Sequence, residues 1–155
     1  MTHHHHIDLV RRGYEALNRG DIASVVDLVH PEFEWTNPPE MVGSRGGTGR
    51  LEFGRYLRGL AETWDDFHCH PEEFHVAGDL LVVVVREGGR GTISGAPVDH
   101  RLVHVWTIHD GEATRLEVFV HTPDALERLY RASEYLPEPE RTGLSAARTL
   151  CWQLV

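Results

Sequence analysis

The sequence predicts an α+β domain in which a curved antiparallel sheet wraps around a long helix. Residues 7–64 contain three segments whose apolar side chains recur at helical spacing, and a further helix begins at Thr122. Between them, from Phe67 onwards, the apolar period changes to two, which is typical of strands. Helices, then a run of neighbouring strands, then a last helix form an α+β arrangement. Because one curved sheet cannot close fully around a helix, we expect a conical half-barrel with one internal pocket.

The helices are predicted as follows. The apolar face of the first consists of Ile7, Val10, Tyr14 and Leu17. Gly20 ends this helix as a left-handed cap, and Asp21 caps the second helix. Pro31 ends the second helix, whose apolar face consists of Ile22, Val25, Val26 and Val29. After a short strand at 33–35 and a Pro/Gly-rich loop at 37–49, the third helix begins at Thr48 or Gly49. Its apolar face consists of Phe53, Tyr56, Leu57, Leu60 and Trp64.

The strands follow in order. Pro71 makes the strand at 67–76 an edge or bulged strand, and residues 77–79 form a turn. Residues 80–85 are an unbroken apolar run, which predicts a strand buried on both faces. The Gly-rich stretch 87–97 holds the end of that strand and a bulge. Asp110-Gly111 joins strands at 98–109 and 112–121 into a hairpin, and Thr122-Pro123 opens the fourth helix.

Composition limits the possible partners. The 155 residues suit one domain, and the net charge is −9. All basic residues are scattered arginines, so we expect no nucleic-acid partner. No apolar run reaches the roughly 18 residues of a membrane span, so we expect no membrane partner. Two distant cysteines give no disulfide framework, and a cytoplasmic location is the default. Residues 1–6 are a His-rich leader, native or a purification tag, and are left out of fold and site reasoning.

Three segments carry a resemblance to a known family. Residues 13–21 (GYEALNRGD) are similar to the helix-turn-helix opening of SnoaL-like domains in the nuclear-transport-factor-2-like superfamily. Residues 30–39 (HPEFEWTNPP) are similar to their first strand and the loop after it. Residues 104–111 (HVWTIHDG), followed by 116–119 (LEVF), resemble their final hairpin. The resemblance assigns residues 7–135 to a SnoaL-like domain and leaves 136–155 as a C-terminal tail.

The superfamily includes ketosteroid isomerases, polyketide cyclases, limonene epoxide hydrolase, dehydratases and members without known chemistry, so the fold does not settle function. The isomerases place a carboxylate base at the position of Asn37, which cannot take up a proton at neutral pH. Their helix-1 tyrosine aligns with Gly13, one residue from Tyr14. Residues 96–100, which include Asp99, resemble the segment that holds their neutral, hydrogen-bond-donating aspartate. With one match in three, we do not expect steroid-type isomerisation.

The sequence also matches limonene epoxide hydrolase only in part. Trp35-Thr36-Asn37 resembles the Tyr-x-Asn segment that holds the attacking water, but the position of the water-activating aspartate corresponds to Val118. The cyclases place an acidic residue near the end of the same strand, where this chain has Glu117 and His121. An imidazole can still act as a base, because its ordinary pKa of ~6.5 lies near neutrality.

Strand alternation selects the pocket-facing residues. It places His100, Leu102, His104 and Trp106 on one face, and the resemblance implies that this face lines the pocket with Val118. Asp99 falls on the opposite face, although a bulge would reverse that parity. His104 is then a neutral base or hydrogen-bonding group in an apolar cavity, or a structural histidine bound to a backbone carbonyl.

The candidate catalytic residues are His104, Asn37, Asp99 and His121. The candidate substrate-binding residues are Tyr14, Trp35, Tyr56, His100, Leu102, Trp106 and Val118. Asn37 either orients a ligand oxygen or water, or only caps the turn before Pro38. Tyr14 and Tyr56 lie on the core-facing sides of their helices, where a role in packing is the first expectation. Their buried hydroxyl groups also need hydrogen-bond partners, which a pocket would supply.

The expected function is cofactor-independent proton transfer on an apolar, oxygenated small molecule by a cyclase, isomerase, dehydratase or hydrolase. The alternative is a ligand-binding or accessory protein that kept the pocket and lost the carboxylates. His68 and His70 are a weak metal signal, because no Glu-x-x-His or Cys pair supports them, so we expect no metal and no cofactor. An outer sheet face carrying Val103, Val105 and Phe119 needs cover, so we expect a homodimer packed through the sheets.

Overall fold

The structure is a computed structural model that describes residues 3–41, 45–120 and 122–133. The helices among these residues are α1 (His3–Asn18), α2 (Ile22–Asp27), α3 (Arg50–Thr63) and α4 (Thr122–Ser133). The strands are β1 (Val29–Thr36), β2 (Gly46–Thr48), β3 (Trp64–Ala77), β4 (Leu80–Gly91), β5 (Pro97–His109) and β6 (Glu112–Phe119). No helix in the described part of the chain is both long and apolar enough to cross a lipid bilayer.

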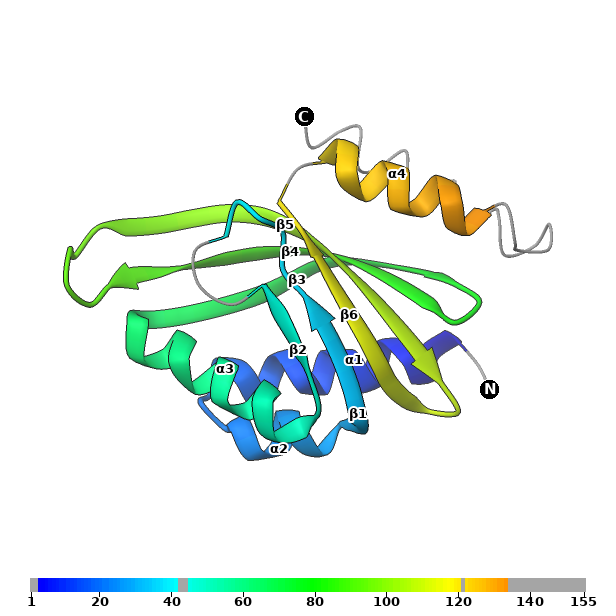
Figure 1. Ribbon diagram of the computed structural model, residues 1–155, viewed down its shortest axis with the longest axis horizontal. Coiled ribbons are helices and arrows are strands. Elements are labelled where there is room, and N and C mark those ends of the chain that lie inside the picture. Colours follow the sequence, from blue (N-terminus) through cyan, green and yellow to red (C-terminus); the bar gives the residue numbers. More distant parts are fainter. Residues whose placement is uncertain (1–2, 42–44, 121, 134–155) are drawn as a thin grey trace.

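The six strands form one curved sheet that does not close into a barrel, in the order β2-β1-β6-β5-β4-β3 (Figure 1). All neighbouring strands are antiparallel except β1 and β6, which are parallel. Helices α1, α2 and α3 cover one face, whereas α4 lies on the other face. This arrangement confirms the predicted α+β class and the half-barrel, with one parallel pair in addition.

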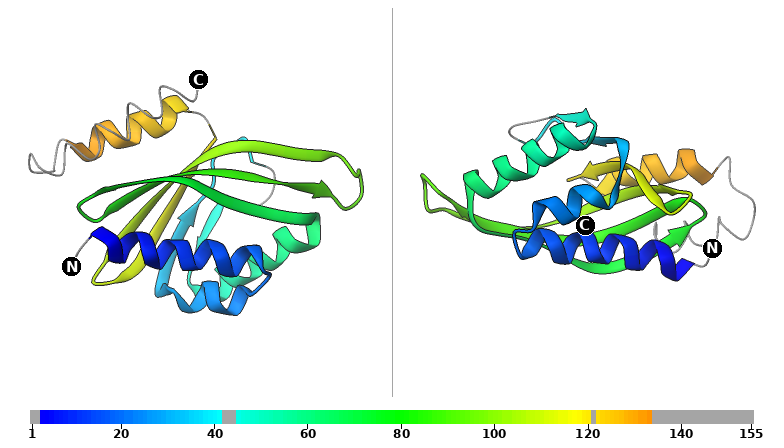
Figure 2. Two further views of the ribbon diagram at one scale, coloured as in Figure 1. Left: turned by 180° about the vertical axis from the view of Figure 1, so that it is seen from behind. Right: turned by 90° about the horizontal axis from the view of Figure 1, so that it is seen from below.

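Helices α1 and α3 both pack directly on the concave face of the sheet, so the sheet does not wrap around the third predicted helix alone. Figure 2 shows α1 running along β3, against which it packs. The shorter α3 contacts β1, β2 and β3. Both helices are amphipathic, so their apolar stripes face the sheet and enclose the space between the two layers.

Local sequence explains most element boundaries. The side chain of Asp21 caps α2 as predicted, accepting a hydrogen bond from the backbone N–H of Ser24 at 3.2 Å. Helix α1 begins at His3, so the histidine run forms its first turn. Pro31 lies inside β1, in the stretch where the register with β6 shifts, because a bulged strand tolerates a residue that lacks an N–H.

The predicted loop at 37–49 contains the short strand β2, which the sequence analysis missed. Gly47 pairs with Trp35 of β1. A Cβ atom at Gly47 would lie 2.5 Å from the Trp35 ring, so only glycine permits this close approach. Further along the chain, the predicted Asp110-Gly111 hairpin is confirmed, since both residues have the positive φ angles that such turns require (49° and 77°).

The outer face of the sheet is partly covered by the chain itself. Val103 and Val105 form a buried cluster with Ala125 and Leu129 of α4. Phe119 packs against the same cluster. Helix α4 therefore packs on the apolar residues from which a sheet-packed homodimer is expected, and the homodimer stays a prediction.

Candidate active site

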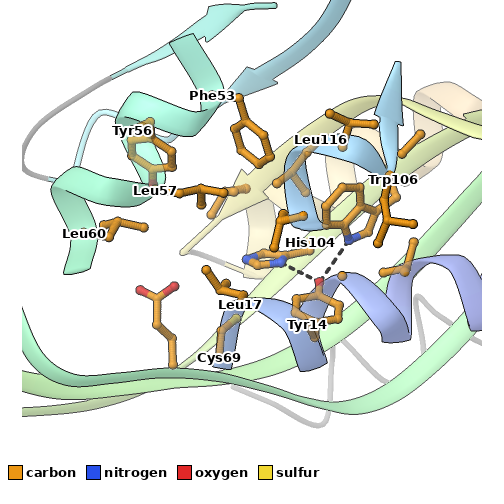
Figure 3. Close-up of a pocket in the computed structure, with 18 of the residues that line it drawn as sticks. Tyr14, Leu17, Phe53, Tyr56, Leu57, Leu60, Cys69, His104, Trp106 and Leu116 are labelled. Carbon is orange, nitrogen blue, oxygen red and sulfur yellow. Dashed lines mark hydrogen bonds between the residues drawn. The ribbon is translucent and has the colours of Figure 1, made fainter. Parts of the chain in front are cut away.

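An apolar cavity of about 70 Å³ lies between the concave face of the sheet and the helices. Figure 3 shows aromatic and aliphatic side chains from α1, α3 and the sheet pointing into it. The described lining residues with a polar side-chain atom are Tyr14, Asn37, Tyr56, Cys69, Glu87, His104 and Trp106. No arginine lines the cavity in this described set. The site is therefore a small apolar chamber with a few polar groups that converge on it.

Tyr14, His104 and Trp106 form a buried hydrogen-bonded chain at the inner wall of the cavity (Figure 3). The indole Nε1–H of Trp106 donates to Tyr14 Oη at 2.9 Å, and Tyr14 Oη lies 2.7 Å from His104 Nδ1. Since Trp106 is only a donor, the Tyr14 hydroxyl keeps its own hydrogen, which it can donate to Nδ1. In the tautomer that gives this hydrogen an acceptor, His104 carries its proton on Nε2, the ring nitrogen on the side away from Tyr14.

Burial keeps this chain neutral. It lowers the pKa of His104 from the ordinary 6.5 to about 4, although the negative charge of Glu87 acts in the opposite direction. Burial also raises the pKa of Tyr14 well above its ordinary value. At neutral pH the cavity therefore presents an uncharged imidazole that is held in one orientation.

Glu87 of β4 is the carboxylate that the sequence analysis missed. It belongs to the cavity wall, and its side chain is 16% exposed. His100 Nε2 lies 3.2 Å from its Oε1, and this hydrogen bond is the main reason why the pKa of His100 is raised. Because the His100 side chain is 40% exposed and His104 is only 6% exposed, Glu87 lies between the solvent side and the interior of the cavity.

Cys69 of β3 is the second residue that the sequence analysis missed. Its backbone N–H donates to Asn18 Oδ1 at 2.7 Å, and its carbonyl accepts from Asn18 Nδ2 at 2.9 Å. The end of α1 is thereby fixed to the sheet. Burial raises the pKa of the Cys69 thiol well above its ordinary value. Cys69, Glu87 and His104 each place one potential ligand atom within 4.8 Å of the others.

Asn37 and Tyr56 contribute polar groups from β1's loop and from α3. Asn37 Nδ2 donates to Tyr56 Oη at 3.0 Å, and burial raises the pKa of Tyr56 to about 12. The backbone N–H of Asn37 also donates to the carbonyl of Arg45 at 2.9 Å. The Asn37 side chain therefore reaches the cavity, whereas the bond to the loop is made by its backbone.

Most predicted substrate-binding residues lie at the cavity. Tyr14, Tyr56, Trp106 and Val118 line it, as do the catalytic candidates Asn37 and His104. Trp35 and Leu102 are buried in the adjoining core without belonging to the cavity lining. His100 reaches the cavity only through Glu87.

Of the other two catalytic candidates, Asp99 is not brought to the cavity. Asp99 lies on the outer face, where its carboxylate pairs with Arg86 Nη1 at 3.0 Å. The reason is strand alternation, which continues without a bulge from His104 back to Asp99 in the pairing of β5 with β4. His121 lies outside the described residues.

The SnoaL-like domain model matches residues 10–116 of the chain. No curated protein matches this chain. Among solved structures, TerC co-crystallised with polyporic acid is 26% identical, with 78% of this chain and 95% of that chain covered and a TM-score of 0.67. An NTF2-like protein from Burkholderia pseudomallei K96243 is 25% identical, with 82% and 97% covered and a TM-score of 0.69.

A third solved structure is SalBIII, an epoxide hydrolase/cyclase-like enzyme with a role in pyran ring formation in the polyether salinomycin. It is 18% identical, with 72% of this chain and 87% of that chain covered and a TM-score of 0.63. At this identity the likeness concerns the fold alone. The fold family thus has polyketide cyclase and epoxide hydrolase/cyclase-like members.

Proposed function

The chain belongs to the family of SnoaL-like domains, and from this premise we propose that it is a cofactor-independent enzyme that transfers a proton on a small oxygenated molecule. The reaction class is that of a cyclase, isomerase, dehydratase or hydrolase. One observation carries the proposal: the hydrogen-bonded chain of Trp106, Tyr14 and His104 ends in an apolar cavity that also contains the Glu87 carboxylate. A buried, oriented hydrogen-bond donor beside a carboxylate is an arrangement suited to acid–base chemistry.

His104 acts as a hydrogen-bond donor in this proposal. An imidazole whose pKa is about 4 holds a proton too weakly to be an efficient general base at neutral pH. Its neutral Nε2–H can instead donate to a carbonyl, epoxide or hydroxyl oxygen and stabilise the negative charge that develops there. Tyr14 is a positioning residue, because its hydroxyl fixes the ring through Nδ1.

Glu87 is the proton acceptor in this proposal. It is the one carboxylate among the described residues that line the cavity, and His100 holds it by a hydrogen bond from the solvent side. The Glu87 side chain is 16% exposed and belongs to the cavity wall, so its carboxylate is in a position to receive a proton from a bound substrate. In this proposal His104 therefore stabilises the developing negative charge, and Glu87 is the base.

The expected substrate is neutral and carries an oxygen function on an apolar frame. Rings from Phe53, Tyr56 and Trp106 line the cavity, and no arginine of the described lining is present to bind a carboxylate or phosphate. Tyr56 Oη accepts from Asn37, so its hydroxyl hydrogen can donate to a second substrate oxygen. Polyporic acid is tested as well, because TerC was co-crystallised with it; as an acid it also checks the expectation of a neutral substrate.

A second candidate function is ligand binding without catalysis. Asn37 and Val118 occupy positions at which the resemblance to isomerases and to the epoxide hydrolase leads one to expect carboxylates. A protein that lost both groups would keep the cavity and bind its ligand without converting it. The two candidates differ in whether Glu87 changes turnover or only affinity.

The test starts with a thermal-shift screen of polyporic acid and of polycyclic and terpenoid ketones, epoxides and alcohols. Ligands found in this way are incubated with the protein in D₂O, and proton exchange and product formation are followed by mass spectrometry. We expect Glu87→Gln to lower turnover by roughly 10²–10⁴-fold while affinity stays within about tenfold. Asp99→Asn, on the outer face, is the matched control and should leave the rate unchanged. Binding without exchange or turnover in the unaltered protein would overturn the enzymatic proposal.

A further inference from the structure

Three cavity side chains together have the donor set of a transition-metal site. Cys69, Glu87 and His104 come from the three adjacent strands β3, β4 and β5 and offer one sulfur, one oxygen and one nitrogen. These ligand atoms all lie within 4.8 Å of one another. Thiolate, carboxylate and imidazole are the side chains that bind Zn²⁺ in proteins.

The backbone geometry already suits such a site. Cys69 and Glu87 are direct partners in the register of β3 and β4. The direct partner of Glu87 on β5 is His100, and His104 lies four residues further along on the same face, with a ligand atom within 4.8 Å of those of Cys69 and Glu87. In a tetrahedral zinc site the ligand atoms lie about 3.3–3.6 Å apart, as bond lengths of 2.0–2.3 Å dictate. The three side chains therefore need to close by about 1 Å, which side-chain rotation into the cavity supplies without a change of the sheet.

Charge also favours a divalent ion. A thiolate, a carboxylate and a neutral imidazole have a total charge of −2, which one divalent cation neutralises. Binding breaks the Cys69 S–H bond, forms an S–metal bond and releases the proton to solvent. Burial disfavours the charged thiolate in the metal-free protein, and a bound cation would offset this effect by stabilising the thiolate directly.

We propose that Cys69, Glu87 and His104 bind one zinc-type divalent ion, with a further coordination position open to the cavity. Each ligand has a supporting contact: Tyr14 at His104 Nδ1, His100 at Glu87, and Asn18 at the backbone of Cys69. Coordination through Nε2 requires the His104 tautomer whose Nδ1–H donates to Tyr14 Oη. Such contacts orient metal ligands and contribute to affinity.

The site differs from the histidine pair that the sequence suggested. His68 and His70 stack on each other with ring centroids 5.1 Å apart, and neither belongs to the three-residue cluster. A bound ion would take Nε2 of His104 and the carboxylate of Glu87, the two groups to which the proposed function assigns proton transfer. The metal site stands on geometry without that function, but if both hold, the bound ion inhibits the enzyme.

Cobalt titration of the full-length protein tests the inference. His3, His4, His5 and His6 are replaced by glutamine, so that the histidine run does not bind the ion while α1 keeps its length. Under reducing conditions we expect one equivalent of Co²⁺ to give intense tetrahedral d–d bands and a thiolate-to-cobalt charge-transfer band, which Zn²⁺ abolishes. One proton per ion should be released.

Matched variants locate the ion. Cys69→Ser should abolish the charge-transfer band, and Cys151→Ser, which removes the other cysteine, should retain it. Tyr14→Phe leaves all three ligands in place and should weaken Co²⁺ binding by roughly 10–100-fold while the spectrum keeps its shape. This variant also keeps the test valid if Cys69→Ser fails to fold. His68→Ala should bind as the parent does.

Two results would overturn the metal site: a titration without the charge-transfer band, or a band that survives Cys69→Ser. Either result leaves the proton-transfer proposal intact, because that proposal is tested by turnover, and the turnover assay is repeated with a chelator so that no bound ion contributes. Conversely, if the protein binds a ligand in the presence of a chelator without converting it, the proton-transfer proposal fails. The cobalt spectrum then still tests the metal site. The two proposals can therefore fail separately.

Discussion

Replacement of His104 by asparagine tests whether burial holds the imidazole neutral. His104 lies at the inner end of the cavity, and burial lowers its pKa to about 4. Asparagine does not titrate, and its side-chain oxygen can take the place of Nδ1 as the acceptor for the Tyr14 hydroxyl. The variant therefore removes the titration of this group while it keeps an acceptor for the hydrogen bond.

The magnitude follows from the two pKa values. In the unfolded chain a histidine has a pKa of ~6.5, which is higher than that of His104 in the folded protein. Between the two values the unfolded chain binds more protons, so folding stability is lost as the pH falls from ~6.5 towards 4. At pH 7.5 the effect is close to zero, and at pH 4.5 the lost stability amounts to roughly 2–3 kcal/mol.

Urea unfolding at pH 7.5 and at pH 4.5 measures this loss. Carboxylates also titrate in this range, but they do so in both proteins, so the difference between parent and variant isolates His104. The free energy of unfolding should fall by roughly 2–3 kcal/mol more in the parent than in His104→Asn. His109→Asn is the control, because the His109 side chain is 66% exposed, and it should behave as the parent does. Equal losses in parent and His104→Asn would refute the burial argument.

Three further substitutions test contacts that hold the site and the fold. Tyr14→Phe should lower the free energy of unfolding by about 2–6 kcal/mol, because two buried groups each lose a partner at ~1–3 kcal/mol; a loss below about 1 kcal/mol would contradict the buried chain. Asn18→Ala removes both bonds to the Cys69 backbone and should increase amide hydrogen exchange at Cys69 at least tenfold, whereas unchanged exchange would mean that α1 does not fix β3. Glu117→Gln breaks the pair with Arg128 of α4 and should release α4 to proteolysis; the energetic loss should stay below the roughly 3–5 kcal/mol of a fully buried pair, because Arg128 is 28% exposed.

The fold was predictable from the sequence where the signals are local. Alternation on β5 places Leu102 and Trp106 in the inner core and Val103 in the outer cluster, because a strand has only two faces. The Asp110-Gly111 turn needs nothing beyond its own two residues. Strand β2 was not predictable in this way, because three residues rich in glycine become a strand only through pairing with β1.

The site was predictable only for residues whose position depends on one element. His104 and Trp106 follow from the alternation on β5, and Tyr14 follows from the apolar stripe of α1. Glu87 begins the Gly-rich stretch in which the sequence suggested a bulge, so its face was not determined. Its neighbour Cys69 depends on the register of β3 against β4, which shifts twice along the pair. Register is set by tertiary packing, and the sequence of either strand alone does not contain it.

Asn37→Ala decides on which wall of the cavity the chemistry takes place. Asn37 donates to Tyr56 Oη at 3.0 Å. In our proposal this pair binds a second substrate oxygen and takes no part in proton transfer. Loss of one neutral hydrogen bond costs about 0.5–1.5 kcal/mol, so KM should rise by roughly 2–13-fold while turnover changes little. Tyr56→Phe, which keeps the ring and removes the hydroxyl, should give the same pattern if the two residues act as one unit. If Asn37→Ala instead slowed turnover by roughly 10²-fold or more, and Glu87→Gln had little effect, the groups that carry out the reaction would lie on the wall formed by Asn37 and α3 and not on the sheet.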